Sequence, residues 1–241
     1  VLTSKPKFGF FQSEKNIFII VSDSHFIQIC RDKRNTSNFL QKINIRIPNP
    51  IDKFHPTFPL FAKPYDGSLS KDLHIIMSKD GLTPEILNNP KLLFMEYIDK
   101  EKYKEFTVDM YYGRDYYVKA IVPRERLEIR AGEINKGYTR KNFLVNYLKE
   151  RMIYLPGVVG CICIQLFYRE DDNDVIGIEI NPRFGGGYPL SYYANANFPN
   201  SIIQEYYLNQ SIEYSDKWLD NTLMLRYDSE VIVYEEKDCN I

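Results

Sequence analysis

Apolar residues fall into short runs along the chain, and most of these runs have the length of a β-strand. The β-branched run at residues 17–22 predicts a buried strand. Apolar runs at residues 59–64, 73–77 and 92–98 predict three further strands, and prolines bound the first of them. A polar stretch at residues 65–72 separates two of these strands and is predicted to form a loop.

The second half of the chain is richer in strand-like runs. Predicted strands there cover residues 106–112, 116–122, 127–130, 158–168 and 175–181, with a terminal strand or hairpin at 222–235. Turn residues at 113–115 and an acidic stretch at 170–174 predict hairpins. Strands joined by hairpins pair antiparallel, so the pattern predicts a mostly antiparallel α+β fold.

Apolar positions at helical spacing predict the helices. These are expected after a capping residue at Asp23 or Ser24, and at residues 36–43, 141–152, 189–194 and 200–208. In the segment 141–152, for example, Leu144, Leu148 and Met152 lie on one face, which is therefore expected to be buried.

Composition and charge exclude several classes of protein. The chain has 241 residues, 44% hydrophobic and 26% charged, which is enough for one large domain or two small ones. Its 31 Lys and Arg residues nearly match its 32 Asp and Glu residues, so it lacks the positive excess of a non-specific nucleic-acid binder. No apolar run approaches the roughly 20 residues that span a bilayer. We therefore expect neither a nucleic-acid partner nor a membrane partner.

Cysteine spacing argues against a disulfide scaffold and against a structural zinc site. The four cysteines are Cys30, Cys161, Cys163 and Cys239. They form no CxxC pair, and no histidine lies at zinc-ligand spacing from them. This pattern predicts a reducing, cytoplasmic location.

The strongest candidate for chemistry is a group of three polar residues on two neighbouring predicted strands. Glu179 and Asn181 are two positions apart, so they face the same side of their strand, and Gln165 lies on the preceding strand. One carboxylate and two amides offer the oxygen ligands that Mg²⁺ prefers. The alternative is a hydrogen-bonded cluster at the strand ends, which spacing alone favours slightly.

Basic residues and glycines near predicted strand ends suit an anion such as phosphate. Arg183 follows Pro182 beside the proposed metal group, and the glycines at 185–187 can present backbone N–H groups at a helix start. Lys63 ends an apolar strand before the Gly/Ser loop at 66–72, and a loop of this kind can close over phosphates. A flexible turn and a solvated hairpin loop are the alternatives.

Taken in order, these motifs resemble those of the ATP-grasp superfamily, in particular carbamoyl-phosphate synthase large-chain-like ligases. The series consists of Ala62-Lys63-Pro64, the loop at 66–72, Met95-Glu96-Tyr97-Ile98, Glu105-Phe106-Thr107-Val108-Asp109, Gln165 and Glu179-Ile180-Asn181-Pro182-Arg183. Each motif is weak by itself, whereas their order, from about residue 31 to residue 209, is specific. The resemblance implies an ATP-grasp fold of the α+β class, in which two α+β lobes hold ATP between antiparallel sheets.

The resemblance also implies an ATP site. It assigns ATP contacts to Lys33, Lys63, Gly67, Ser68, Ser70, Lys71, Glu96, Tyr97, Ile98 and Glu105. Lys33 matches the first basic contact, and Lys63 matches the strand lysine on the phosphates. Residues 67–71 match the flap over the β- and γ-phosphates. Residues 96–98 match the hinge whose backbone reads adenine, and Glu105 matches the acid that binds the ribose.

The same resemblance assigns the metal ligands and one catalytic residue. Gln165, Glu179 and Asn181 match the ligands of Mg²⁺ (or Mn²⁺). Arg183 matches the arginine that stabilises the acyl-phosphate step. These roles follow from the match to the family motif at each position.

A second catalytic residue is expected among three closely spaced arginines. Arg124, Arg126 and Arg130 occupy the region where such enzymes hold acidic substrate groups. We favour Arg130 among them. The alternative is that all three are surface charges paired with Glu125 and Glu128.

The sequence departs from the family pattern at the flap and before it. Leu69 and Asp72 stand where the flap has glycines, and Asp72 adds negative charge near the phosphates. Such ligases carry a preceding α/β domain, of which residues 1–22 are expected to be a remnant. Residues 23–98 are then expected to form linker helices and the small lobe, and residues 99–241 the large lobe with the metal site.

The favoured function is an ATP- and Mg²⁺-dependent ligase that joins a small-molecule carboxylate to an amine through an acyl phosphate. One alternative is an ATP-binding pseudoenzyme or truncated ATP-grasp fragment without turnover. A second alternative is an interaction module, because the chain contains 19 Tyr and 15 Phe residues.

Overall fold

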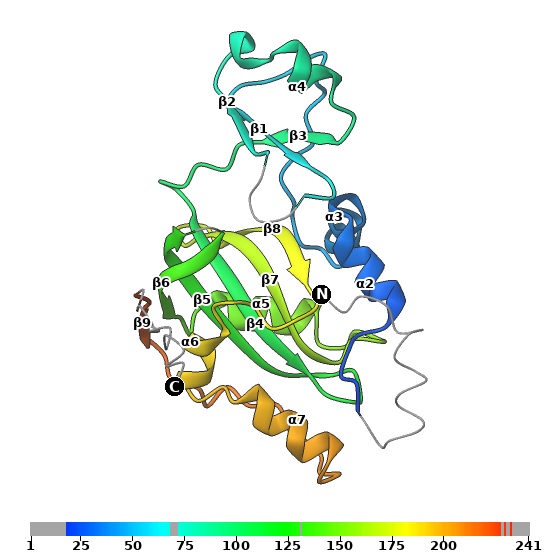
Figure 1. Ribbon diagram of the computed structural model, residues 1–241, viewed down its shortest axis with the longest axis vertical. Coiled ribbons are helices and arrows are strands. Elements are labelled where there is room, and N and C mark those ends of the chain that lie inside the picture. Colours follow the sequence, from blue (N-terminus) through cyan, green and yellow to red (C-terminus); the bar gives the residue numbers. More distant parts are fainter. Residues whose placement is uncertain (1–17, 68–71, 131, 228, 230–231, 233–241) are drawn as a thin grey trace, which may run out of the picture.

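The chain folds into two antiparallel β-sheets with short helices around them (Figure 1). A computed structural model describes residues 18–67, 72–130, 132–227, 229 and 232. Within these residues, the larger sheet has six strands in the order β8-β7-β4-β5-β6-β9, and the smaller sheet has three in the order β2-β1-β3.

The strands vary in length from three to thirteen residues. The smaller sheet contains β1 (Leu60–Pro64), β2 (His74–Ile76) and β3 (Leu92–Glu96). The larger sheet contains β4 (Lys104–Tyr112), β5 (Val118–Arg130), β6 (Glu133–Thr139), β7 (Gly160–Arg169), β8 (Asp174–Asn181) and β9 (Leu223–Leu225).

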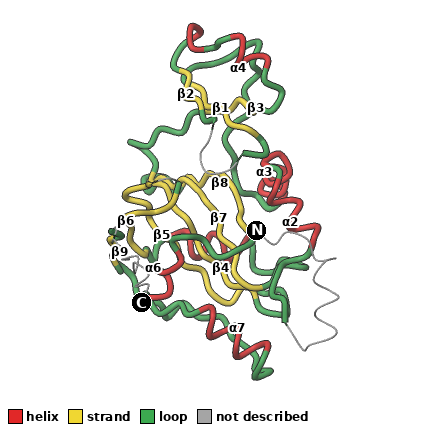
Figure 2. The backbone as a smooth tube through the Cα atoms, viewed as in Figure 1, coloured by secondary structure: helices red, strands yellow, loops and turns green. Residues whose placement is uncertain are grey.

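The helices are short and lie around the two sheets. They are α2 (Ser24–Arg31), α3 (Lys33–Lys42), α4 (Pro84–Asn88), α5 (Phe143–Arg151), α6 (Tyr188–Tyr193) and α7 (Phe198–Tyr206), with a 3-10 turn at Lys79–Gly81. The smaller sheet and α4 form one end of the molecule, and α7 lies at the opposite end (Figure 2).

The main hydrophobic core surrounds β4, the strand between β5 and β7. Residues 106–112 of this strand are all buried, because β4 has a neighbour on both edges and is covered on both faces. Leu144 and Leu148 of α5 are fully buried in this core, as the helical spacing predicts. A central strand of this kind provides a rigid base for the side chains that its neighbours present.

Helices α2 and α3 pack against the larger sheet. Asp23 caps α2 by accepting a hydrogen bond from the backbone N–H of Phe26 at 2.8 Å, as predicted. Phe26 and Leu40 are buried in the main core. Gly177 of β8 allows the close approach, because a Cβ atom there would lie 2.7 Å from Cδ1 of Leu40.

Several sequence predictions of secondary structure are wrong in detail. The described part of the predicted strand at 17–22 is irregular: Ile20 packs against Gly160, while the strand hydrogen bonds of β7 go to its neighbours β4 and β8. The predicted strands at 116–122 and 127–130 are one strand, β5. The predicted terminal strand at 222–235 reduces, within the described residues, to β9.

Other elements were predicted with shifted bounds or were not predicted. Helix α3 begins three residues before the predicted start at Thr36, because the side chain of Asp32 caps the backbone N–H of Arg34. Strand β6 and helix α4 have no counterpart in the sequence prediction. The predicted hairpins at 113–115 and 170–174 are confirmed.

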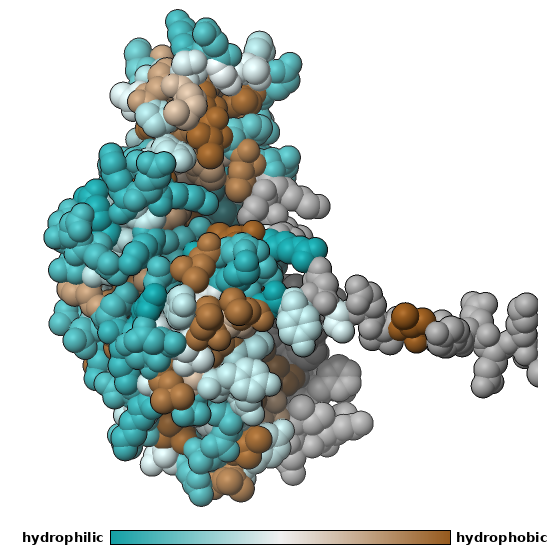
Figure 3. Space-filling view, turned by 90° about the vertical axis from the view of Figure 1, so that its left-hand side faces the viewer, coloured by the Kyte–Doolittle hydropathy of each residue, from teal (hydrophilic) through white to brown (hydrophobic). Residues whose placement is uncertain are grey.

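The face drawn in Figure 3 is largely hydrophilic, with apolar patches at its upper end and over its middle and lower part. None of the helices in the described part of the chain is long and apolar enough to cross a membrane.

Candidate functional site

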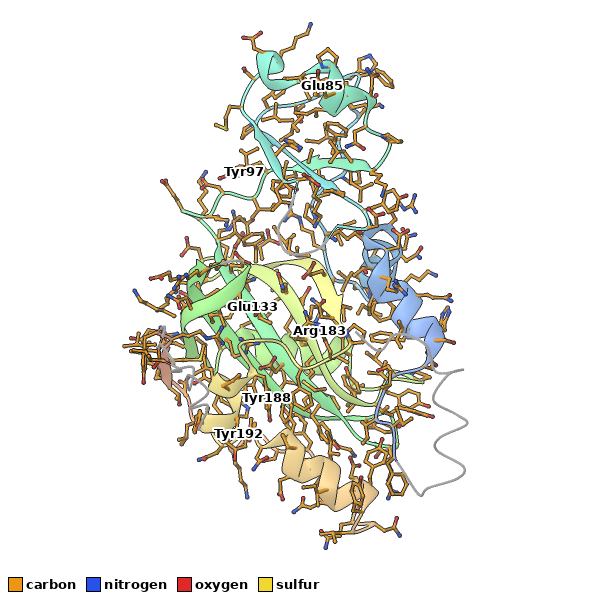
Figure 4. All side chains as sticks on the ribbon, in the orientation of Figure 1. Glu85, Tyr97, Glu133, Arg183, Tyr188 and Tyr192 are labelled. Carbon is orange, nitrogen blue, oxygen red and sulfur yellow. The ribbon has the colours of Figure 1, made fainter. Side chains whose placement is uncertain are left out.

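The two sheets enclose a cavity of about 1180 Å³. Its walls come from β1, β2 and β3 on one side and from β5, β7 and β8 on the other. Tyr97 lies where the chain passes between the sheets, and Glu133 and Arg183 lie at the facing edge of the larger sheet (Figure 4). Most of the chemistry-bearing residues singled out by the sequence line this one space.

Part of the cavity wall is apolar and comes from both sheets. Phe61 lies between Ile75 and Met95 in the register of the smaller sheet, so the three side chains lie side by side on one face. Phe167 and Ile178 line the cavity from the larger sheet. An apolar gap between two sheets suits a flat aromatic group such as a nucleobase.

Lys63 extends from β1 into the cavity and is only 8% exposed. Burial lowers the pKa of its ammonium group from 10.5 to about 8. The carboxylate of Glu179 opposes this shift, whereas the charge of Lys33 adds to it. The three charged groups therefore lie close enough to influence one another, although they come from different elements.

Lys33 connects the first turn of α3 to the start of the flap segment. Its ammonium group donates a hydrogen bond to the carbonyl of Gly67 at 2.5 Å, and its backbone N–H donates to the carbonyl of Tyr65 at 2.9 Å. The predicted flap contacts Ser68, Ser70 and Lys71 lie outside the described residues. Asp72 directly after them has a φ of 55°, the left-handed conformation that glycine adopts most readily.

The predicted hinge connects the two sheets directly after β3. The carboxylate of Glu96 accepts hydrogen bonds from Arg46 at 2.7 Å and from the side chain of Asn49 at 2.8 Å. These contacts engage the carboxylate within the protein, so it is not the group expected to bind a ligand. No hydrogen bond within the described part of the chain uses the backbone groups of Tyr97 or Ile98. Their N–H and C=O groups are therefore the hinge groups suited to reading a base edge.

The three predicted metal ligands are brought together. Gln165 and Glu179 are directly opposite each other in the β7–β8 ladder, and the amide nitrogen of Asn181 donates to Oε1 of Glu179 at 2.9 Å. All three side chains are half-buried and line the cavity. One carboxylate with two amide oxygens is a hard-oxygen set that fits Mg²⁺ or Mn²⁺ shared with phosphate.

A site made of acidic or soft ligands is not found in the same region. Across the described residues, no three His, Cys, Asp or Glu side chains gather at a point that could hold a metal ion. A metal ion at the cavity would therefore depend on the amides and on a bound anion as well as on Glu179.

Glu105 is paired with Arg126, whereas Arg130 is the arginine that the sequence favours. Nη1 of Arg126 lies 2.6 Å from Oε1 of Glu105, and the ammonium of Lys100 lies 3.7 Å from Oε2. Arg126 lines the cavity, whereas Arg130 is exposed at the end of β5 and does not line it. Arg124 is fully buried in an ion pair with Asp109 at 2.7 Å.

A break in the strand register separates Arg126 from Arg130. The β5–β6 ladder shifts between Arg126 and Glu128 and again between Glu128 and Ile129. A bulge changes the face that the following side chains occupy. Arg130 follows the bulge and therefore reaches a different environment from Arg126, which precedes it, and the sequence contains no clear signal of the bulge.

Arg183 is exposed, lines the cavity and donates a hydrogen bond from Nη1 to the carbonyl of Phe184 at 2.9 Å. Two of the glycines after it are closely packed. A Cβ atom at Gly187 would meet the guanidinium of Arg124, and one at Gly186 would meet the carboxylate of Glu133. The segment therefore fits closely over the side chains of Arg124 and Glu133, and the anion-binding role of its backbone N–H groups stays a prediction.

The cavity thus collects most of the predicted site residues. Those that line it are Lys33, Lys63, Gly67, Glu96, Tyr97, Ile98, Glu105, Gln165, Glu179, Asn181 and Arg183. Their assigned roles stay predictions. Arg126 also lines the cavity, although the sequence favours Arg130 among the three arginines.

Comparison with solved structures shows the ATP-grasp fold. The biotin carboxylase domain of 2-oxoglutarate carboxylase from Hydrogenobacter thermophilus, in complex with MgADP, ADP and bicarbonate, matches 92% of this chain and 55% of its own at 14% identity and a TM-score of 0.66. N5-carboxyaminoimidazole synthetase from Staphylococcus aureus, complexed with ADP, matches 89% and 59% at 17% identity and a TM-score of 0.62. The L-amino acid ligase from Bacillus licheniformis matches 80% and 51% at 16% identity and a TM-score of 0.55.

The chain therefore spans little more than half the length of these structures. No protein of curated function matches the sequence significantly. A family model described as "ATP-grasp in the biosynthetic pathway with Ter operon" matches residues 88–224, which is more than half of the 241 residues. Together with the cavity between two antiparallel sheets, this match shows that the chain belongs to that ATP-grasp family.

Proposed function

We propose that the protein is an ATP- and Mg²⁺-dependent ligase that joins a small-molecule carboxylate to an amine through an acyl phosphate. The observation that carries the proposal is the convergence of Lys63 from the smaller sheet and Glu179 from the larger sheet on one cavity. A cation and a metal-binding carboxylate on opposite walls suit a triphosphate held between them.

The nucleoside part of ATP would occupy the apolar part of the cavity. Phe61 and Ile178 face this space from opposite sheets, and the backbone groups of Tyr97 and Ile98 are suited to hydrogen-bonding adenine. Glu105, at the start of β4, would accept hydrogen bonds from the ribose hydroxyls. This placement points the triphosphate toward Lys63 and the ends of β7 and β8.

The phosphate end is where the chain's charged groups would act. Lys33 and Lys63 would neutralise phosphate oxygens. The oxygens of Glu179 and Asn181, next to Gln165, would hold Mg²⁺ or Mn²⁺, which when bound supplies charge neutralisation to the phosphates. Positioning and charge stabilisation would supply the rate, and no protein nucleophile is required.

The reaction would proceed in two balanced steps. A substrate carboxylate oxygen attacks the γ-phosphorus, the bond to the β-phosphate oxygen breaks, and ADP leaves with that electron pair. The amine then attacks the acyl carbon, the C–O bond to phosphate breaks, and amide, inorganic phosphate and a proton are released. Arg183, exposed on the cavity wall, is suited to hold the transferred phosphoryl group.

Two of the structural relatives support this class of reaction. One is named a carboxyaminoimidazole synthetase and was solved with ADP, and another is named an L-amino acid ligase. We further propose the division into a small lobe at residues 23–98 and a large lobe at residues 99–241, and a cytoplasmic location. The carboxylate and amine substrates are small molecules under this proposal.

The test is ADP release from Mg-ATP in the presence of panels of carboxylates and amines. The parent is expected to release ADP with at least one pair, and Glu179→Ala is expected to reduce the rate about 10²-fold or more. Glu170→Ala is the matched control, because Glu170 is an exposed acid outside the cavity. Identical traces for the parent and Glu179→Ala would refute the ligase.

A second candidate is nucleotide binding without turnover. Asp72 favours it, because this acid stands at the end of the flap in a conformation that glycine adopts readily. It predicts that Mg-ATP raises the melting temperature of the protein while no acceptor yields product. Detection of an amide product by mass spectrometry would exclude it.

A further inference from the structure

Arg126 lies between the ribose region and the metal region of the proposed nucleotide site. Its side chain is 5% exposed and lines the cavity. Nη1 donates to Oε1 of Glu105 at 2.6 Å and to Oε1 of Gln165 at 3.2 Å, and Nη2 donates to the carbonyl of Gly132 at 2.8 Å. A single nitrogen therefore contacts both the predicted ribose acid and a predicted metal ligand.

The contact with Arg126 fixes the orientation of the Gln165 amide. A guanidinium group can only donate hydrogen bonds, so the atom that faces it must be the amide oxygen. The NH₂ group of Gln165 is consequently turned away from Arg126. A flipped amide would place two donors against each other.

The Asn181 amide has the opposite arrangement. Its nitrogen donates to Oε1 of Glu179 at 2.9 Å, so its oxygen points away from that carboxylate. No hydrogen bond within the described residues uses the Asn181 side-chain oxygen. The two amides at this edge therefore differ: the oxygen of Gln165 is engaged by a cation, and the oxygen of Asn181 is available.

A metal ion on the Gln165 oxygen would be next to a fixed positive charge. The same oxygen that would ligate it already faces Nη1 of Arg126, so metal and guanidinium would repel each other in a half-buried environment. The negative charge of Glu105 is divided between Arg126 and Lys100 and so compensates only part of this repulsion.

We infer that Arg126 is a positioning residue that removes the Gln165 oxygen from the metal set. Glu179 and Asn181 then hold the metal ion, and Gln165 presents its NH₂ group toward the cavity, where a phosphate oxygen can accept from it. This inference rests on the proposed function, since it concerns the metal–nucleotide complex. It assigns different roles to two amides that the family motif treats alike.

The experiment measures Mn²⁺ binding by electron paramagnetic resonance with a non-hydrolysable ATP analogue at a concentration that saturates each variant. Asn181→Ala is expected to weaken Mn²⁺ binding about tenfold or more, and Gln165→Ala less than threefold. The two variants form a matched pair, because each removes one amide from a half-buried strand position. Equal losses of Mn²⁺ affinity in the two variants would overturn the inference.

A second comparison tests Arg126 itself. Arg126→Met retains the volume of the side chain and frees the Gln165 oxygen, so Mn²⁺ affinity is expected to rise. This gain is expected to disappear in the double variant Arg126→Met/Gln165→Ala, and a gain that persists there would contradict the inference. If Arg126→Met does not fold, the comparison of the two amides decides the matter by itself.

The two proposals fail in different ways. Absence of nucleotide-dependent Mn²⁺ binding in the parent would overturn the proposed function. Binding in the parent with a tenfold loss in Gln165→Ala would overturn only the role of Arg126. Melting curves of each variant without nucleotide show whether a loss of binding reflects loss of the fold.

Discussion

The carboxylate of Glu179 on β8 acts on the pKa of Lys63 on β1 across the cavity, although the two residues belong to different sheets. Burial lowers the pKa of Lys63, and the Glu179 carboxylate is the largest influence in the opposite direction. The positive and negative groups of the proposed binding site therefore come together only when the two sheets face each other as they do here.

The affinity for ATP is expected to fall as the pH rises above about 8. Lys63 has a pKa of about 8 in the free protein, and its charged form is the one that attracts phosphate. Below that pH the group is already charged, whereas above it ATP binding must take up a proton, which lowers affinity by up to about tenfold per pH unit. Isothermal titration calorimetry between about pH 7 and about pH 9.5 measures the effect.

Lys63→Arg provides the control for this pH dependence. An arginine remains charged over the whole range, so its affinity profile is expected to be flat. A parent profile that is equally flat would show that the charge of Lys63 does not contribute to binding.

Phe61→Ala is expected to weaken ATP binding about tenfold, because an aromatic side chain against a base contributes about 1–3 kcal/mol. Phe61 lines the cavity from β1. Phe54→Ala is the matched control, since Phe54 is 76% exposed and does not line the cavity. Equal dissociation constants for the two variants in a fluorescence titration would place the base elsewhere.

Arg183 and Arg130 are expected to differ sharply in a turnover assay. Arg183 lines the cavity, and its removal is expected to lower kcat about 10²-fold while ATP affinity changes little. Arg130 lies at the exposed end of β5, so Arg130→Ala is expected to retain nearly parental kcat. A large loss of kcat in Arg130→Ala would restore it as a catalytic residue.

The sequence predicts the parts of this molecule that depend on local patterns. The hairpins at 113–115 and 170–174 and the buried face of α5 follow from turn residues and helical spacing, and all three are present. The opposed pair Gln165 and Glu179 also follows from one hairpin. Local signals are sufficient where partners are close in sequence.

Other features depend on contacts between distant residues, which a sequence pattern does not show. Strand β6 is polar and contains Gly137, so its own residues do not predict a strand, and it forms because β5 and β9 pair with it. The carboxylate of Glu96 is held by Arg46, fifty residues earlier. The bulge after Arg126 lies between this residue, which lines the cavity, and Arg130, which does not.

Gly187→Ala is expected to destabilise the protein by about 1–3 kcal/mol. The new methyl group would meet the guanidinium of Arg124, which is fully buried and paired with Asp109. Arg124 cannot move without weakening that ion pair, and a buried charge that loses its partner is costly. Urea unfolding measures the change in the free energy of unfolding.

Gly185→Ala is the matched control in the same segment. A Cβ atom at Gly185 would have its nearest neighbours at 3.4 Å, which is ordinary contact, so the change is expected to be neutral or to stabilise the protein by a few tenths of a kcal/mol through the unfolded chain. If both variants unfold at the parental urea concentration, the glycines are not required for packing over Arg124. The expected anion-binding role of this turn would then be the better explanation of why three glycines follow Arg183 and Phe184.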